Sequence, residues 1–413
     1  MGSRISVNIH GNSVTDKNRL LQFLQAIQPR AVLVMDNFAL VQEIKTLLPG
    51  TIVIYRTWPD DDIHMRVSPE EWVNRKVGEL GGWDAWAYTT NEPGFSDALI
   101  NWTVRVMELA QARGLKLVVG NWAVGTPEPH DWPRARRMLE LLDQNRSTMI
   151  MGLHEYACGI ITSGFVGGSP RFIEPQSWPQ DTGALTMWHL GRFKFLLQAC
   201  AQMGIRPPRI ILTEHGFDDV SDIKPWAETL ERAAGYLNIR GWKSIVPQWL
   251  RWFGGLGWSA ERALFEQLAY ADRAIYQNSP VEAQLIFSWG HSSQDWDQFD
   301  VSQAFEFQNL LATAAGAVPT PPPAPAAPVG TTTPPPAPVA PIGVREHIPA
   351  EPPPAPAGLT TMLGDLMSDD DLNTIIAGFR AAAKTGQFNS TISSGFARFA
   401  DVLERYWAKR GAG

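Results

Sequence analysis

Two glutamates stand where strand-like runs of the sequence end. Glu92 lies within Asn91–Pro93, and Glu214 follows the apolar run Ile210–Thr213. If both runs are strands of one closed barrel, the two carboxylates reach the same rim. Two facing carboxylates are the minimal equipment for breaking a glycosidic bond, one serving as acid and base and the other as nucleophile or base. The pair therefore predicts that chemistry.

Each glutamate also has a structural interpretation. An Asn-Glu-Pro string is common in loops that follow strands, and Glu214 could form a structural ion pair with Arg56 or with a neighbouring histidine. The matched positions at the ends of the fourth and seventh runs favour the catalytic interpretation over both.

Eight short apolar runs alternate with segments of helical period, which predicts a parallel (β/α)8 TIM barrel of α/β class. A doubly wound open sheet is the alternative, but no glycine-rich phosphate loop follows the first run. The candidate strands are Ile5–His10, Ala31–Asp36, Thr51–Thr57, Ala85–Thr90, Leu115–Asn121, Met149–Tyr156, Arg209–Glu214 and Ala283–Trp289.

Helices are expected between these runs. Ser68 before Pro69 and two glutamates is a typical helix start, because the serine caps the free amides and proline suits the first turn. The candidate helices are Arg19–Ile27, Pro69–Leu80, Asp97–Arg113, Leu185–Met203 and Ala260–Gln277.

Two further motifs follow candidate strands. His154-Glu155-Tyr156 ends the sixth, and Trp289 ends the eighth within Ser288–Gly290. With the two glutamates, this set resembles the clan A retaining glycoside hydrolases, a cellulase-like barrel superfamily, over roughly residues 5 to 315. The resemblance implies hydrolysis of β-glycosidic bonds in a polysaccharide or oligosaccharide by double displacement, without a cofactor.

The resemblance also implies residue roles. Glu92 becomes the acid and base, Glu214 the nucleophile, and Asn91 the contact to the sugar 2-hydroxyl. His154 would line the cleft. The remaining roles are a hydrogen bond to the nucleophile from Tyr156, support of the nucleophile by Arg56, and a platform under the sugar from Trp289.

Several other residues near strand ends are ambiguous. The 17 tryptophans include Trp58 and Trp122, whose rings could form sugar subsites or pack at the rim. His10 and His215 are further candidates for lining a pocket. Glu155 should face away from the site, because neighbours on a strand point to opposite faces.

Composition excludes several other classes. A net charge of −7 argues against a nucleic-acid surface, and two cysteines make neither a disulfide scaffold nor a zinc site. No apolar run reaches the roughly 18 residues of a membrane span. The acidic groups Asp60–Asp62 and Asp295–Asp300 have oxygen ligands but lack calcium-loop spacing, so no metal site is predicted.

The chain changes character after the predicted barrel, residues 1–317. Residues 318–357 hold half of the 32 prolines and predict a disordered Pro-rich linker. Residues 358–413 predict a small helical module of unknown role, which could self-associate or bind a surface or protein partner.

Two alternative functions stay open. One is a non-catalytic carbohydrate-binding barrel tethered through its helical module, and the other is an enzyme that lyses cell-wall glycan. A glycan substrate and the linker point to an extracellular, virion or cell-wall location, although no signal-peptide hydrophobic region is visible at the N-terminus.

Overall fold

The computed structural model describes residues 2–57, 65–157, 162–166, 169–172, 190–218, 241–291 and 293–317. The chain divides into two units, Met1–Pro322 and Pro323–Gly413. Trp58, the predicted linker 318–357 and the predicted module 358–413 lie outside the described residues. Among the helices that are described, none has both the length and the apolar character needed to cross a bilayer.

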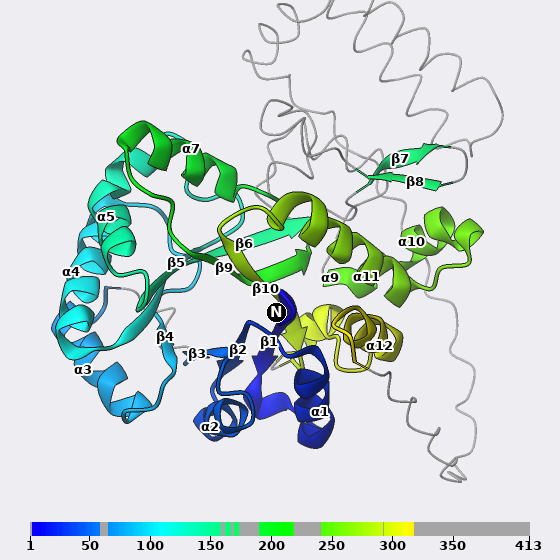
Figure 1. The fold of residues 1–413 in the computed structure, drawn as a ribbon, viewed down its shortest axis with the longest axis horizontal. Helices are drawn as coiled ribbons and strands as arrows, with labels where there is room; N and C mark the ends of the chain where they lie inside the picture. The colour runs from blue at the N-terminus through cyan, green and yellow to red at the C-terminus, as the bar shows by residue number, and fades with distance from the viewer. Residues whose placement is uncertain are drawn as a thin grey trace, which may run out of the picture. The chain divides into compact units, whose positions relative to one another are not determined.

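Eight parallel strands close into a barrel in the order β1-β10-β9-β6-β5-β4-β3-β2 (Figure 1). This confirms the predicted (β/α)8 architecture. A separate antiparallel pair, β7 and β8, was not expected from the sequence. The strands are β1 (Ile5–His10), β2 (Ala31–Met35), β3 (Ile52–Arg56), β4 (Trp86–Tyr88), β5 (Lys116–Trp122), β6 (Met149–Ala157), β7 (Thr162–Val166), β8 (Ser169–Phe172), β9 (Ile210–Phe217) and β10 (Val281–Trp289).

The helices lie outside the ring of strands (Figure 1). Several were expected; α2, α5, α9, α10 and α12 were not. The helices are α1 (Lys17–Ile27), α2 (Phe38–Leu47), α3 (Pro69–Leu80), α4 (Asp97–Arg113), α5 (Arg136–Gln144), α7 (Phe193–Met203), α9 (Gly241–Ser244), α10 (Val246–Phe253), α11 (Ala260–Ala271) and α12 (Phe305–Ala314). The expected helix Ala260–Gln277 is α-helical only to Ala271 and continues as a short π-helix, Asp272–Tyr276.

Local chemistry explains where some helices begin. The Ser68 hydroxyl accepts a hydrogen bond from the Glu71 amide, with Pro69 in the first turn of α3, as the sequence predicted. Ser96 caps α4 in the same way by accepting from the Leu99 amide. Each cap satisfies an amide that has no partner within its helix.

Alternation along the strands sorts side chains into two apolar clusters. A smaller cluster, which includes Leu33, Ile150 and Ile211, fills the barrel interior. A larger cluster, which includes Val32 and Leu212, packs between the strands and the helices. Adjacent strand residues fall in different clusters, as the two-residue period of a strand requires.

Glu155 lies on the helix side of β6 and anchors helix α7. Its side chain is 1% exposed. It accepts hydrogen bonds from the backbone amides of Gly191 (2.6 Å) and Phe193 (2.8 Å) and from the Tyr276 hydroxyl (2.8 Å). The carboxyl thus satisfies amides at the start of α7, a helix whose N-cap residue provides no side-chain cap. Glu155 therefore faces away from the site, as predicted.

Burial raises the pKa of Glu155 from its usual 4.5 to about 7, against the three donors and the charge of Arg192. Between pH 4.5 and pH 7, Glu155 therefore keeps a proton in the folded protein that it has lost in the unfolded chain. The free energy of unfolding falls as pH rises through this range.

We expect Glu155→Gln to remove this pH dependence. The free energy of unfolding of the wild type minus that of the variant should fall by roughly 3 kcal/mol between pH 4.5 and pH 7. Urea unfolding across this pH range measures the difference, and a difference that does not change with pH would contradict the prediction.

Candidate active site

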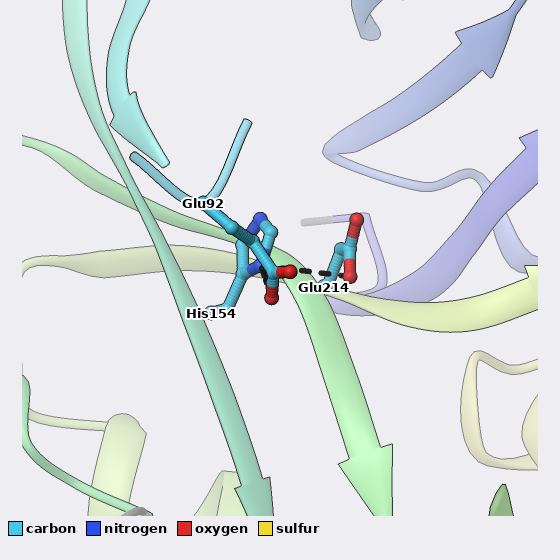
Figure 2. A group of neighbouring side chains, drawn as sticks. All are labelled: Glu92, His154 and Glu214. Atoms are coloured by element: carbon cyan, nitrogen blue, oxygen red, sulfur yellow. Dashed lines mark hydrogen bonds and ion pairs between the residues drawn. The ribbon is translucent and has the colours of Figure 1, made fainter. Parts of the chain in front are cut away.

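Side chains from three strands and one loop converge at the carboxyl-terminal mouth of the barrel. Glu92 follows β4, His154 belongs to β6 and Glu214 to β9. One oxygen of each glutamate and one His154 nitrogen lie within 4.8 Å of one another (Figure 2). Arg56 at the end of β3 and Tyr156 on β6 complete the cluster. The two glutamates expected to meet at the rim do so.

Glu214 points into the barrel because β9 contains an extra residue. Ile211 packs inside the barrel and Leu212 outside, so simple alternation would turn Glu214 towards the helices. The pairing with β6 instead passes from Leu212 opposite Leu153 to Glu214 opposite His154, which leaves Thr213 as a bulge. Bulges of this kind re-aim side chains next to active sites.

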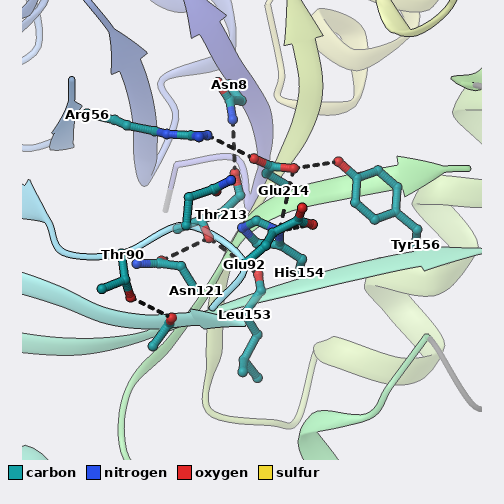
Figure 3. Close-up of polar contacts among 12 residues, drawn as sticks. Asn8, Arg56, Thr90, Glu92, Asn121, Leu153, His154, Tyr156, Thr213 and Glu214 are labelled. Carbon is teal, nitrogen blue, oxygen red and sulfur yellow. Dashed lines mark hydrogen bonds and ion pairs between the residues drawn. The ribbon is translucent and has the colours of Figure 1, made fainter. Parts of the chain in front are cut away.

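Two groups hold the bulged Thr213 in place (Figure 3). The Asn8 side-chain amide donates to its carbonyl at 3.3 Å, and its own hydroxyl donates to Asn121 Oδ1 at 3.1 Å. The Asn121 carbonyl in turn accepts from the Glu92 amide at 3.0 Å. Asn121 therefore ties the backbone beside both glutamates together.

The Glu214 carboxylate is 9% exposed and has donors on both oxygens. Arg56 Nη1 donates to Oε1 at 3.1 Å, and the Tyr156 hydroxyl donates to Oε2 at 2.9 Å (Figure 3). These bonds fix the carboxylate plane and favour its charged form. Arg56 and Tyr156, to which the family resemblance assigned the support of this glutamate, thus both contact Glu214 in the structure.

Glu92 differs from Glu214 in exposure and backbone shape. Its side chain is 45% exposed, and its φ of 43° lies in the left-handed region that few non-glycine residues adopt. Its Oε1 lies 3.1 Å from His154 Nδ1. The Asn121 carbonyl and a second bond, from the Thr90 hydroxyl to the Gly120 carbonyl at 3.1 Å, hold this turn against β5.

His154 is buried between the two glutamates. Its Nδ1 lies 3.1 Å from Glu92 Oε1 and 3.5 Å from Glu214 Oε2. Its Nε2 lies 3.1 Å from the hydroxyl of Tyr88, and that hydroxyl donates to Asn91 Oδ1 at 2.9 Å. The structure therefore joins Asn91, expected as a sugar contact, to the carboxylate pair through Tyr88 and His154.

Burial opposes ionisation of both carboxyls, and their neighbours decide the outcome. For Glu92, the hydrogen bond and charge of His154 and the charge of Arg56 outweigh burial, so its pKa is lowered. For Glu214, burial and the nearby negative charge of Glu92 raise the pKa, against His154, Arg56 and Tyr156. The two carboxyls titrate as a pair because their charges repel.

Two of the expected sugar platforms lie in the hydrophobic core. Trp122 is 1% exposed and packs edge-on against Trp132 at 5.5 Å. Trp289 is 2% exposed and stacks on Phe23 of α1 at 5.1 Å. The pairing of β10 with β1 shifts register just before Trp289, so its ring packs on the helix side. Neither ring is available as a platform in this structure.

Other rings lie beside the carboxylates. His10 packs edge-on against Phe287 at 5.2 Å and Trp296 at 5.0 Å. Phe299 joins Phe287 (5.3 Å) to Tyr156 (6.4 Å). Burial and the charge of Arg56 lower the pKa of His10 to about 3, so His10 is a neutral part of this wall. His215 instead lies on the other face of β9, where its Nδ1 contacts the Glu155 carbonyl at 2.7 Å.

Two clusters have donor sets that could hold a cation. In the first, Glu92, His154 and Glu214, both oxygens of Glu214 already accept hydrogen bonds, one of them from cationic Arg56. The second is made of His291, Asp297 and Asp300. There Lys243 donates to Asp297 Oδ1 at 3.2 Å, and both oxygens of Asp300 accept hydrogen bonds from Gly290 and Ser302. Positive charge and hydrogen-bond donors thus already satisfy these carboxylates.

Sequence reasoning missed four residues that build the site: Asn8, Tyr88, Asn121 and Thr213. All four lie inside or beside strands that read as apolar runs. A polar side chain in such a run needs a partner when buried, and this is the signal that could have found Asn8, Asn121 and Thr213. Their partners could not be read from the sequence, because they come from different strands.

No protein-family model matches the chain, and no curated protein matches it in sequence. Among solved structures, a glucosidase from Croceicoccus marinus is similar to it, with a TM-score of 0.42 and 12% identity. The match covers 76% of this chain and 69% of the glucosidase. A similarity this low carries no inference about substrate or mechanism, so the functional argument depends on the residues of the site.

Gly152 makes room for the Asn121 side chain. A Cβ at this position would stand 1.8 Å from Asn121 Oδ1. We expect Gly152→Ala to lower the free energy of unfolding by about 1–3 kcal/mol, the usual range for overpacking. Asn121→Ala should remove part of this clash, so the double variant should lose less stability than the two single losses added together.

Gly78 on helix α3 provides the control. An added Cβ there meets no atom within 4 Å, so Gly78→Ala should leave stability unchanged or raise it by up to about 1 kcal/mol. Chemical denaturation of all four variants measures these differences. Strict additivity of Gly152→Ala and Asn121→Ala would contradict the proposed contact.

Proposed function

We propose that this protein is a retaining glycoside hydrolase that cleaves β-glycosidic bonds. The observation that carries the proposal is the pair Glu92 and Glu214 at the mouth of the barrel, with oxygens within 4.8 Å of each other. Glu214 is oriented by Arg56 and Tyr156, while Glu92 is the more exposed of the two. One oriented anion and one accessible acid are what double displacement requires.

The spacing supports retention of configuration over inversion. Retaining enzymes place their carboxyl groups about 5–5.5 Å apart, and inverting enzymes about 6.5–9.5 Å apart to admit a water molecule. Oxygens of Glu92 and Glu214 within 4.8 Å of each other match the closer, retaining separation and fall short of the inverting one. Direct attack by a carboxylate fits this separation.

The reaction then has two steps. Glu92 gives a proton to the leaving oxygen while a Glu214 oxygen attacks the anomeric carbon, which forms a glycosyl-enzyme ester. Water then attacks the same carbon, Glu92 takes its proton, and the Glu214 carboxylate leaves. The donors on Glu214 hold it as the attacking anion in the first step and stabilise it as the leaving anion in the second.

Glu92 must carry a proton in the first step, although its pKa is lowered. The group that lowers it most is His154, whose Nδ1 lies 3.1 Å from Glu92 Oε1. A proton held across that contact is therefore available to Glu92. It can return to Glu92 when a substrate oxygen arrives to receive it.

The residues around the pair favour a sugar as the substrate. Asn91 lies next to the acid, with its carbonyl oxygen bonded to Tyr88 and its amide nitrogen end left to meet a sugar hydroxyl. Trp296, half-buried and packed on His10 and Phe287, offers aromatic surface of the kind that packs on a pyranose. We take the substrate to be a β-linked polysaccharide or oligosaccharide.

Replacing either glutamate should abolish hydrolysis without unfolding the protein. We expect Glu214→Gln and Glu92→Gln each to lower kcat by about 10²–10⁴-fold or more, because each removes a group that acts in the transition state. Reducing-sugar release from β-glucans, mannan, xylan, chitin and peptidoglycan measures the loss. Glu140→Gln is a matched control, since Glu140 pairs with Arg136 on the outer helix α5.

The outcomes separate the candidate functions. Release of sugar from one polymer that disappears only in the two site variants supports the hydrolase, and release from peptidoglycan alone supports a lytic enzyme. Full activity in Glu214→Gln would overturn the mechanism. Binding of a glycan without hydrolysis would favour the carbohydrate-binding barrel.

The two roles can be told apart by adding azide to alanine variants with an activated aryl glycoside. In Glu214→Ala, azide can attack the anomeric carbon from the emptied side and give a glycosyl azide of inverted configuration. In Glu92→Ala, azide can attack the glycosyl-enzyme and give a product of retained configuration. The anomeric proton coupling in NMR spectra distinguishes them, and the reverse pattern would exchange the two roles.

A further inference from the structure

We propose that Tyr88 holds His154 in the tautomer with hydrogen on Nε2, so that His154 Nδ1 and Glu92 Oε1 keep one proton between them. Tyr88 is then a positioning residue for the acid Glu92, and Asn91 sets the direction in which the Tyr88 hydroxyl donates its hydrogen. The role of this proton in hydrolysis rests on the proposed function; the tautomer itself does not.

The direction of one hydrogen bond carries the inference. A tyrosine hydroxyl has one hydrogen to donate. In Tyr88 this hydrogen is donated to Asn91 Oδ1 at 2.9 Å. The same hydroxyl lies 3.1 Å from His154 Nε2, and the contact is buried. Because the hydrogen is already used, the Tyr88 oxygen can only accept from Nε2, which must therefore carry hydrogen.

The hydrogen on Nε2 then determines whether the other ring nitrogen of His154, Nδ1, carries hydrogen. With hydrogen on Nε2, a neutral His154 has a bare Nδ1, and this atom lies 3.1 Å from Glu92 Oε1. The contact is a hydrogen bond only if one proton lies between the two atoms. Either Glu92 is a carboxylic acid beside a neutral imidazole, or it is a carboxylate beside an imidazolium.

Losing that proton is costly while Tyr88 keeps its position. The Glu92 carboxylate would then face the lone pair of Nδ1 in a partly buried contact. The ring could relieve this repulsion only by moving its hydrogen to Nδ1, which leaves Nε2 without hydrogen opposite a Tyr88 oxygen that also offers a lone pair. Tyr88 would have to give up Asn91 to repair that contact.

Three other groups face the pair. Arg56 on β3 adds positive charge and favours loss of the proton. Glu214 on β9 lies 3.5 Å from Nδ1 and favours its retention. Tyr156 on β6 contributes a neutral hydroxyl that is bonded to Glu214, because burial raises its pKa well above the usual value. The charged neighbours oppose each other, so the tautomer set by Tyr88 is the added influence that retains the proton.

The first experiment reads the tautomer directly. The full chain is labelled with 15N-histidine, and long-range proton–nitrogen spectra are recorded from acidic to alkaline pH. The chain has 8 histidines, and the signals lost in His154→Gln identify the ring of interest. We expect hydrogen on Nε2 throughout in the wild type. A neutral His154 with hydrogen on Nδ1 would overturn the proposal.

Two variants should release the constraint. Tyr88→Phe removes the acceptor for Nε2, and Asn91→Ala frees the Tyr88 hydrogen to turn towards Nε2. At alkaline pH both should move the His154 hydrogen to Nδ1. Asn91 is half-buried in a loop, so its variant keeps the test available if Tyr88→Phe does not fold. Unchanged hydrogen on Nε2 in a folded variant would contradict the role of Tyr88.

The second experiment reads the consequence for the acid. In Tyr88→Phe, the freed ring stabilises the Glu92 carboxylate, so the alkaline limb of the kcat/KM profile should move down by about one pH unit. Tyr276→Phe is the matched control, since that buried hydroxyl bonds to Glu155 on the other face of β6. A uniform loss of activity with no movement of the limb would indicate a merely structural role.

The two experiments fail independently. If no glycan is hydrolysed, the proposed function fails, while the histidine spectra still decide the tautomer. If hydrolysis is found but His154 carries hydrogen on Nδ1, the function stands and the role of Tyr88 is wrong.

Discussion

The site depends on the bulge at Thr213. Without the extra residue, the two-residue period of β9 would turn Glu214 away from the barrel mouth, and the pair with Glu92 would not exist. Buried polar groups from other strands hold the bulge. The Asn8 side chain donates a hydrogen bond to the Thr213 carbonyl, and Asn121 Oδ1 accepts one from the Thr213 hydroxyl. A local irregularity is thus maintained by hydrogen bonds that an apolar barrel interior makes costly to break.

The same network positions the second carboxylate. Asn121 is itself an extra residue on β5, because Gly120 pairs with Gly152 and Trp122 with Leu153. Its carbonyl holds the Glu92 amide, and its side chain occupies the space that Gly152 leaves open. One asparagine therefore couples the two strand ends through its backbone and its side chain, which restricts the separation of the two carboxylates.

Strand β6 serves two purposes on its two faces. His154 and Tyr156 contact the glutamates inside the barrel, while Glu155 between them binds the start of α7 outside. Burying three polar side chains in a row requires partners for each. The strand is therefore held on both faces beside His154. This restricts how far the rings of His154 and Tyr156 can shift.

The sequence by itself determined the barrel, several helix starts and the two glutamates at matched strand ends. These features depend on neighbouring residues: apolar runs mark the strands, and Ser68 and Pro69 begin α3 beside the amides that they satisfy. Strand alternation also predicted the outward face of Glu155, but only the tertiary structure decided the faces of Trp289 and Glu214. Trp289 packs on Phe23, and Glu214 turns inwards through Thr213, Asn8 and Asn121. These outcomes depend on contacts between residues far apart in the chain, which no local pattern specifies.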